Sequence, residues 1–185
     1  MRLFTAIPVP DDIKQYATVI KKQLESTSPD IKWVEEENYH LTLKFLGEVS
    51  PDDLQQLYDF LERAAVSSTS FRLRLQGMGF YPHRRRPRVL WAGVTGEIDK
   101  ALFLGERVDA YLASLNFEPE KRRDYHLTLG RIRSERNVNE LINKVMAIGE
   151  SVQSSYFTVR EFCLMESQLT SGGPIYTVKR KFTLE

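Results

Sequence analysis

The sequence predicts an α+β fold with two related lobes, each built on a mostly antiparallel sheet flanked by helices. The pentapeptide Tyr-His-Leu-Thr-Leu occurs at residues 39–43 and again at residues 125–129, 86 residues further along a chain of 185. Chance produces such a repeat in fewer than about one chain in a hundred. In both halves the motif strand precedes a helix, a long strand and a second strand that can pair with it. We therefore expect a pseudo-two-fold relation between the lobes, with a cleft between them.

Each element follows from a local pattern in the sequence. Apolar alternation bounded by turn residues predicts strands at residues 3–9, 31–34, 40–46, 71–79, 88–94, 126–132, 156–164 and 174–182. Apolar residues at helical spacing predict helices from about residue 11 to 24, from 51 to 61, from 99 to 115 and from 137 to 148. Asp11 or Asp12 is placed to cap the first helix, and Ser50 to cap the second. Pro51 takes the first position of that second helix.

Composition indicates an ordinary globular protein of one domain. The length suits one well-packed core, and no linker separates the halves, so residues 1–185 are predicted to form a single compact bilobal domain. A net charge of +1 gives no overall field for nucleic acid, so an RNA-binding surface must be local. The basic run at residues 83–88 is interpreted as a solvated loop.

Localisation and assembly are predicted from what the chain lacks. No segment resembles a signal peptide or a membrane span. Cys163 is the lone cysteine, which excludes an intramolecular disulfide and indicates a reducing, cytoplasmic compartment. Nothing in the sequence points to an obligate protein partner, so we expect a monomer.

The two copies of the motif place a polar pair on one face of a strand. Side chains two residues apart share a face, so His40 and Thr42 point one way while the leucines point the other. His126 and Thr128 repeat the arrangement. One neutral imidazole can act as a base while the other, protonated, acts as an acid, and this pairing suits phosphoryl transfer. The hydroxyls can donate to the non-bridging phosphate oxygens.

Arg131 is a further candidate for binding phosphate. It stands five residues after His126, so strict alternation places it on the opposite face, and a bulge at Gly130 is needed to bring it back. One His-x-Thr motif alone is more often structural, but core packing has no reason to keep the polar pair twice. Two histidines without a carboxylate or cysteine cluster are too few for a closed zinc site. Cys163 lies in an apolar strand pattern, and His83 is interpreted as an exposed loop residue.

Taken together, these motifs resemble the 2H phosphoesterase superfamily, and most closely its bacterial and archaeal RNA 2′,3′-cyclic phosphodiesterases, also known as 2′-5′ RNA ligases. The resemblance covers almost the whole chain and rests on the segments 2–8, 33–34, 39–49, 90–94 and 126–131. It implies a bilobal fold with both motifs lining a central cleft. It also implies hydrolysis of RNA 2′,3′-cyclic phosphate ends to a 2′-phosphate, with no metal and no cofactor.

The resemblance also implies roles for individual residues. His40 is the expected proton donor and His126 the proton acceptor, with Thr42, Thr128 and Arg131 holding the phosphate. Phe45 stands where Arg131 stands in the second copy. It is a candidate for stacking on a substrate base, and a core position is the alternative. The expected partners are RNA or nucleotides with 2′,3′-cyclic phosphate ends.

Two other functions stay open at this point. The reverse reaction would join a 5′-hydroxyl to the cyclic phosphate, giving a 2′-5′ linkage with the same acid and base. Abundant water favours hydrolysis unless the second RNA is held in place. A non-catalytic RNA- or nucleotide-binding module is the other alternative, although a binder has no need for both histidines and both threonines.

Overall fold

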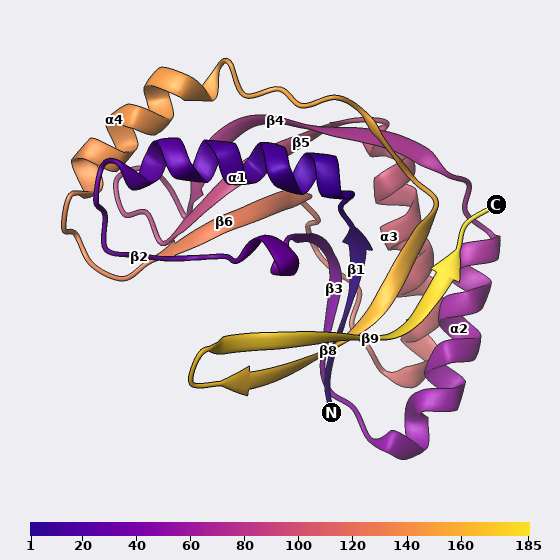
Figure 1. Cartoon of the computed structure of the whole chain (residues 1–185). Coiled ribbons are helices and arrows are strands. Elements are labelled where there is room, and N and C mark those ends of the chain that lie inside the picture. The colour runs from indigo at the N-terminus through magenta and orange to yellow at the C-terminus, as the bar shows by residue number, and fades with distance from the viewer.

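The computed structural model describes residues 1–185 and confirms the predicted α+β class (Figure 1). The helices are α1 (Asp11–Glu25), α2 (Leu54–Val66), α3 (Ile98–Leu112) and α4 (Val138–Gly149). The strands are β1 (Arg2–Pro8), β2 (Ile31–Trp33), β3 (His40–Glu48), β4 (Phe71–Tyr81), β5 (Val89–Gly96), β6 (His126–Ile132), β7 (Phe157–Val159), β8 (Glu161–Thr170) and β9 (Gly173–Thr183). Short 3₁₀ turns are η1 (Glu36–Asn38), η2 (Pro51–Asp53) and η3 (Ala113–Leu115). None of the helices combines the length and the apolar character that a membrane span requires.

All nine strands belong to one curled antiparallel sheet. Its order is β7-β4-β5-β6-β3-β1-β8-β9, and β2 pairs with β6. The pairing between β3 and β6 consists of Leu41 opposite Leu127 alone. The predicted antiparallel sheets of the two lobes therefore join at this single point. We call β1, β3, β8 and β9 the first-motif lobe, and β2, β4, β5, β6 and β7 the second-motif lobe.

Each hairpin joins the lobe that contains the motif strand of the other half of the chain. The β4–β5 hairpin follows the first motif in sequence, yet β5 pairs with β6, which carries the second motif. The β8–β9 hairpin follows the second motif, yet β8 pairs with β1 in the first-motif lobe. Figure 1 shows the β8–β9 hairpin crossing the lower part of β1 and β3 and projecting to the left. Each lobe is thus assembled from both halves of the sequence.

One hydrophobic core of 37 buried residues draws on both lobes. The motif leucines belong to it: Leu41, Leu127 and Leu129 are fully buried, and Leu43 is nearly so. Helices α2 and α3 pack side by side, α2 also contacts β9, and α1 contacts α4 (Figure 1). The leucine face of each motif strand is therefore anchored in the core, which leaves the histidine face free for the site.

The structure corrects two of the predicted elements. Helix α1 begins at Asp11 itself, after Pro10, and no side chain caps it, so the prediction of a cap by Asp11 or Asp12 is wrong. Both carboxylates lie in the first turn, where they interact favourably with the helix dipole. The single strand expected at residues 156–164 is two strands, β7 and β8, which pair with β4 and β1 respectively. The break falls at Arg160 and Glu161, two adjacent charged residues at which the alternation of Phe157 and Val159 stops.

The structure confirms Ser50 as the cap and Pro51 as the first residue at the start of the second helical segment. The Ser50 hydroxyl accepts a hydrogen bond from the backbone N–H of Asp52 at 3.3 Å, and Pro51 takes the first position. The first turn is the 3₁₀ turn η2, and α2 continues from Leu54. This start turns the chain from β3 into the helix that covers the first-motif lobe.

Candidate active site

The motif strands β3 and β6 bring their four polar side chains onto one face of the sheet. The strands are antiparallel with Leu41 opposite Leu127, so one step along the register sets His40 opposite Thr128 and His126 opposite Thr42. The imidazoles are diagonal neighbours in this arrangement, a relation that in a regular ladder sets residues about 7–8 Å apart with their Cβ atoms somewhat closer, and the charge of His126 acts on His40. That spacing leaves room for one tetrahedral phosphate between the rings, with a hydroxyl on either flank.

Both imidazoles are held by the same backbone contact. His40 Nδ1 lies 2.8 Å from the carbonyl oxygen of Asn38, and His126 Nδ1 lies 3.1 Å from that of Asp124. Because a carbonyl only accepts, each neutral ring carries its proton on Nδ1 and presents the Nε2 lone pair to the site. His40 Nε2 is also 3.0 Å from the Thr42 hydroxyl. Each Nε2 is thus the atom available for proton transfer.

Aromatic rings surround each imidazole. The ring centroids of Phe4 and Tyr176 lie 5.1 and 5.3 Å from that of His40, with Tyr176 edge-on. Tyr81 lies edge-on to His126 at 5.1 Å, and Trp91 lies at 6.4 Å. These rings come from four different strands, so the sequence alone does not assign them to the site. They fix the imidazoles and remove water from around them.

This environment favours the neutral form of both histidines. Burial lowers the pKa of His40, and the charges of Lys14 and His126 lower it further, against the contact with the Asn38 carbonyl. Burial also lowers the pKa of His126, with a further contribution from Arg131 and opposition from Asp124. In the ligand-free protein each ring therefore gives up its proton below its ordinary pKa.

Irregularities at matching positions shift the face of both motif strands. The β1–β3 register passes from Thr42 to Lys44, so Leu43 is the extra residue. The β5–β6 register passes from Thr128 to Gly130, so Leu129 is the extra residue. After each irregularity the alternation changes phase. Lys44 and Gly130 consequently turn inward and are buried, whereas Phe45 and Arg131 face the side of the histidines.

Phe45 and Arg131 consequently flank the site. Phe45 is 68% exposed and lies 6.2 Å from Phe4, ring to ring, so the alternative that it is a core residue is wrong. Arg131 is exposed, and its charge acts on both His126 and Tyr176, opposing the rise that burial causes in the pKa of Tyr176. A guanidinium in that position can reach a phosphate held between the imidazoles.

Gly130 is required by the close approach of β2. A Cβ at this position would lie 2.6 Å from Ile31 Cδ1 and 3.2 Å from the backbone oxygen of Lys32. Strand β2 pairs with β6 here, with Lys32 opposite Arg131. Because Gly130 has no side chain, β2 can pair with this end of β6. This pairing fixes the position of the Arg131 backbone.

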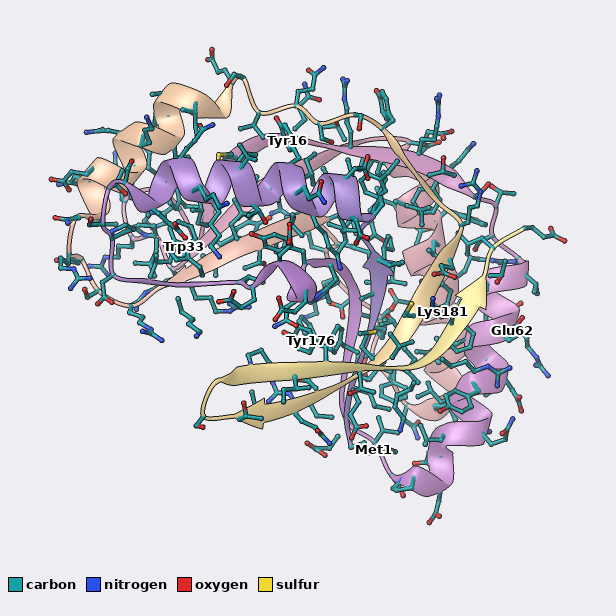
Figure 2. All side chains as sticks on the ribbon, in the orientation of Figure 1. Met1, Tyr16, Trp33, Glu62, Tyr176 and Lys181 are labelled. Atoms are coloured by element: carbon teal, nitrogen blue, oxygen red, sulfur yellow. The ribbon has the colours of Figure 1, made fainter.

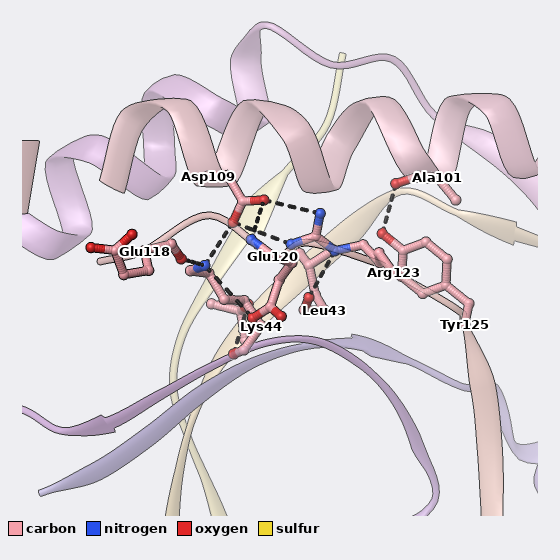
Figure 3. A network of polar contacts seen from close by, with 9 residues as sticks. Leu43, Lys44, Ala101, Asp109, Glu118, Glu120, Arg123 and Tyr125 are labelled. Carbon is pink, nitrogen blue, oxygen red and sulfur yellow. Dashed lines mark hydrogen bonds and ion pairs between the residues drawn. The ribbon is translucent and has the colours of Figure 1, made fainter. Parts of the chain in front are cut away.

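A buried ionic network, which the sequence did not reveal, supports the first motif from behind (Figure 3). Lys44 Nζ lies 2.7 Å from Asp109 Oδ1 on α3 and donates to the carbonyl of Glu118. Arg123 contacts both oxygens of Asp109 at 3.2 Å, and its Nε donates to the carbonyl of Leu43 at 3.1 Å. Burial acts to raise the pKa of Asp109, but hydrogen bonds from Arg123 and Lys44 outweigh it and the pKa is lowered.

The network joins both motifs. Leu43 is the irregular residue of β3, and Arg123 stands three residues before His126. Tyr125, the first residue of the second motif copy, donates its hydroxyl to the Ala101 carbonyl on the same helix α3 at 2.7 Å. Strict alternation places Lys44 on the face of His40 and Thr42, so no local pattern in the sequence signals this network.

Other candidates lie apart from this chemistry. His83 is exposed in the loop after β4, where its Nδ1 accepts a hydrogen bond from the backbone of Arg85, in agreement with the loop interpretation. Cys163 is buried, and burial raises the pKa of its thiol to about 11, so it is a poor nucleophile at neutral pH. No group of three or more His, Cys, Asp or Glu side chains is arranged to hold a metal ion.

Comparison with known proteins defines the class to which this fold and site belong. A two-lobed antiparallel α+β fold is shared with TT0787 of Thermus thermophilus, with a TM-score of 0.82, 28% identity, and coverage of 100% of this chain and 98% of that one. It is also shared with Escherichia coli LigT complexed with 3′-AMP, with a TM-score of 0.76, 26% identity, and coverage of 99% and 97%.

Sequence relatives agree with this structural class. The chain is 37% identical to the RNA 2′,3′-cyclic phosphodiesterase of Archaeoglobus fulgidus over 98% of its own length and 99% of the relative. It is 32% identical to the protein of that name from Methanothermobacter thermautotrophicus, over 100% and 99%. The family model of LigT-like phosphoesterases matches residues 7–91 and 95–176. The chain belongs to the LigT-like phosphoesterase family and is an enzyme of the phosphodiesterase class, which confirms the resemblance.

Proposed function

We propose that this protein hydrolyses the 2′,3′-cyclic phosphate at the end of an RNA to a 2′-phosphate, without a metal ion. The observation that carries the proposal is the diagonal pair of imidazoles, each tied through Nδ1 to a backbone carbonyl and presenting Nε2 to the same face. This arrangement supplies one proton acceptor and one proton donor across a single phosphate. The names of the sequence relatives support the choice of substrate.

The proposed reaction is an in-line displacement at phosphorus. A water oxygen attacks phosphorus while His126 Nε2 takes the proton that the water loses. The bond between phosphorus and the 3′-oxygen breaks, and protonated His40 gives its Nε2 proton to that leaving oxygen. The product carries a 2′-phosphate monoester and a free 3′-hydroxyl, with one proton gained by His126 and one lost by His40.

The remaining side chains hold the charge of the phosphate. Thr42 and Thr128 flank the imidazoles on the same face and can donate to the non-bridging oxygens. Arg131 adds a charge-assisted contact and also favours the neutral, basic form of His126. The anionic substrate opposes the effect of burial on His40, because a negative charge between the rings raises the pKa of an imidazole. Substrate binding thus helps to protonate the acid that the reaction needs.

The test is an assay with adenosine 2′,3′-cyclic phosphate in excess chelator, followed by identification of the product isomer by ³¹P NMR. We expect turnover with adenosine 2′-monophosphate as the product. A 3′-monophosphate would show that the 2′-oxygen leaves instead and would contradict the proposed reaction. Activity that disappears in chelator and returns with zinc or magnesium would instead indicate a metallohydrolase.

A further inference from the structure

A cavity of about 220 Å³ opens beside His40, between the start of α1, the η1 turn and the β8–β9 hairpin. Seven of its 12 lining residues are hydrophobic. Figure 2 shows Tyr176 between the hairpin and the η1 turn, and the hairpin is tied to η1 by a hydrogen bond from Asn38 Nδ2 to the Pro174 carbonyl at 3.4 Å. The reaction proposed above uses only the His40 ring from this cavity and leaves the rest of it unassigned.

The walls of the cavity suit a flat ring with polar edges. The ring of His40 and the edge-on ring of Tyr176 form one side, and Cys163 and Val178 contribute apolar surface. The raised pKa of Cys163, about 11, keeps its thiol neutral. The volume is below the roughly 300–1,000 Å³ of sites for drug-sized ligands, so it fits one ring system rather than a whole nucleotide.

Lys14 gives the cavity a single cation. It is partly buried, it lines the cavity, and it takes part in none of the ion pairs of the protein. Its charge reaches His40, because it contributes to the lowered pKa of that ring. An ammonium group has three donors and no acceptor, so it selects a ligand with a ring nitrogen or carbonyl acceptor on its edge.

We infer that this cavity binds the base of the nucleotide that carries the cyclic phosphate, with Lys14 donating to the edge of that base. The inference rests on the proposed function. In a nucleoside cyclic phosphate the base is attached to the same ribose that holds phosphorus through its 2′- and 3′-oxygens. A phosphate between His40 and His126 therefore leaves the base within reach of a cavity whose wall is His40 itself.

A second phosphate of the RNA is the competing occupant of this space. The predominantly apolar lining favours the base, because an anion placed there would lose its water and gain only one cation in return. The apolar faces of a base, in contrast, are stabilised by the surrounding aromatic and aliphatic side chains. The proposed placement also sets the ribose, with its leaving 3′-oxygen, on the side of the site where His40 lies.

The test compares two substrates that differ only in the base: adenosine 2′,3′-cyclic phosphate and methyl riboside 2′,3′-cyclic phosphate. Val178 lines the cavity and is 46% exposed on β9, so Val178→Trp fills the cavity without disturbing the core. Ile175→Trp is the matched control, because Ile175 is 53% exposed on the same strand and does not line the cavity. Lys14→Met and the exposed Lys22→Met make a second matched pair on α1.

We expect Val178→Trp to raise KM for the adenosine substrate about tenfold or more, the scale expected when a base loses its stacking surface. Its kcat/KM for the methyl riboside should stay within about twofold of the unaltered value, since the phosphate site is untouched. Lys14→Met should also discriminate between the substrates, and neither control should do so. Equal losses on both substrates, or no loss on either, would overturn the base pocket.

Failure of the proposed function has a separate signature. If the unaltered protein hydrolyses neither cyclic phosphate, the proposed reaction is wrong. The pocket is then judged by equilibrium binding of adenosine 2′-monophosphate, which Val178→Trp should weaken and Ile175→Trp should not. Equal binding by these two variants would overturn the pocket independently of turnover.

Discussion

At the level of single residues, the two histidines share a sequence context but differ in their neighbours. His40 Nε2 contacts a hydroxyl within its own strand, and its ring stands beside Lys14 and the cavity. His126 lies near the charge of Arg131. Its Nδ1 contacts the backbone carbonyl of Asp124, and the carboxylate of the same residue also acts on the ring. Identical pentapeptides cannot encode this asymmetry, which arises from residues elsewhere in the chain. It supplies the physical basis for giving the rings different roles.

A leaving-group experiment distinguishes the proposed acid from the proposed base. With adenosine 2′,3′-cyclic phosphate, His40→Ala and His126→Ala should each lose about 10²–10⁴-fold in kcat, the usual contribution of a positioned acid or base. In a substrate with sulfur at the 3′-bridging position, the leaving group is a thiolate, which needs little protonation. On that substrate His40→Ala should recover most of its turnover in a steady-state assay, while His126→Ala should stay impaired. Recovery by His126→Ala instead would exchange the two roles.

The pH profile of kcat/KM reports the two lowered pKa values in the free enzyme. Activity requires neutral His126, so it should rise with pH through the pKa of that ring. It also requires protonated His40, so it should fall as pH passes the pKa of His40. Since both pKa values are lowered, both limbs should lie below the ordinary histidine value of about 6.5.

Arg131 provides a direct test of the rising limb. Arg131→Met removes a charge that lowers the pKa of His126, so the rising limb of the profile should move to higher pH. The maximum activity should also fall. Arg131→Lys should keep the limb near its original position. Lys32→Met is the matched control, because Lys32 is the cross-strand partner of Arg131 and does not contribute to the shift of His126. An unmoved limb in Arg131→Met would show that Arg131 does not act on His126.

At the level of elements, the sequence predicted the motif strands well and their irregularities poorly. Strand β6 has the predicted bounds, and the buried leucines of β3 follow the predicted parity. The extra residues Leu43 and Leu129 were not predicted, although a bulge was suggested beside Gly130. A bulge depends on how the neighbouring strand pairs, which no local pattern encodes. The ion pair of Lys44 and Asp109, 65 residues apart, is equally non-local.

The buried network should be sensitive to which member is removed. Asp109→Asn leaves the buried Arg123 without a carboxylate and leaves Lys44 with only the more exposed Glu120 at 3.7 Å, so we expect a loss of about 3–5 kcal/mol in the free energy of unfolding. Lys44→Met leaves Asp109 paired with Arg123, so its loss should be clearly smaller. Urea denaturation at neutral pH measures both.

An exposed ion pair supplies the control for this comparison. Lys100→Met removes the partner of Glu97 on the surface, where solvent screens the pair, and should leave the free energy of unfolding nearly unchanged. If Lys44→Met proved at least as damaging as Asp109→Asn, the stabilising centre of the network would be the lysine rather than the aspartate. Equal m-values for all three variants would show that the denatured state is unchanged.

At the level of the whole molecule, the sequence predicted the class of fold but not how the chain is distributed between the lobes. The repeat indicated a motif strand, a helix and a hairpin in each half, and all of these are present. Their order in the chain gives no sign that each hairpin pairs with the opposite lobe. Pairing partners of strands far apart in sequence are chosen by the assembled sheet, so a local pattern does not specify them.

The exchanged hairpins predict how the protein unfolds. Both lobes share one core of 37 buried residues, and each contains strands from both halves of the chain. We therefore expect a single cooperative transition, consistent with one domain, when circular dichroism and tryptophan fluorescence are followed together in urea. Trp33 and Trp91 both lie in the second-motif lobe, so an early change in fluorescence would reveal separate unfolding of that lobe.

The exchange also bears on protein synthesis, because the chain emerges from the ribosome in sequence order. By the time β6 has been made, both histidines are present, yet the first-motif lobe still lacks β8 and β9. Tyr176, one of the rings beside His40, is made only after β6 is complete. An interrupted translation product that contains both motifs consequently lacks one wall of the site and one edge of the sheet. Possession of both histidines is thus not enough, and the site is complete only when the last hairpin has joined the sheet.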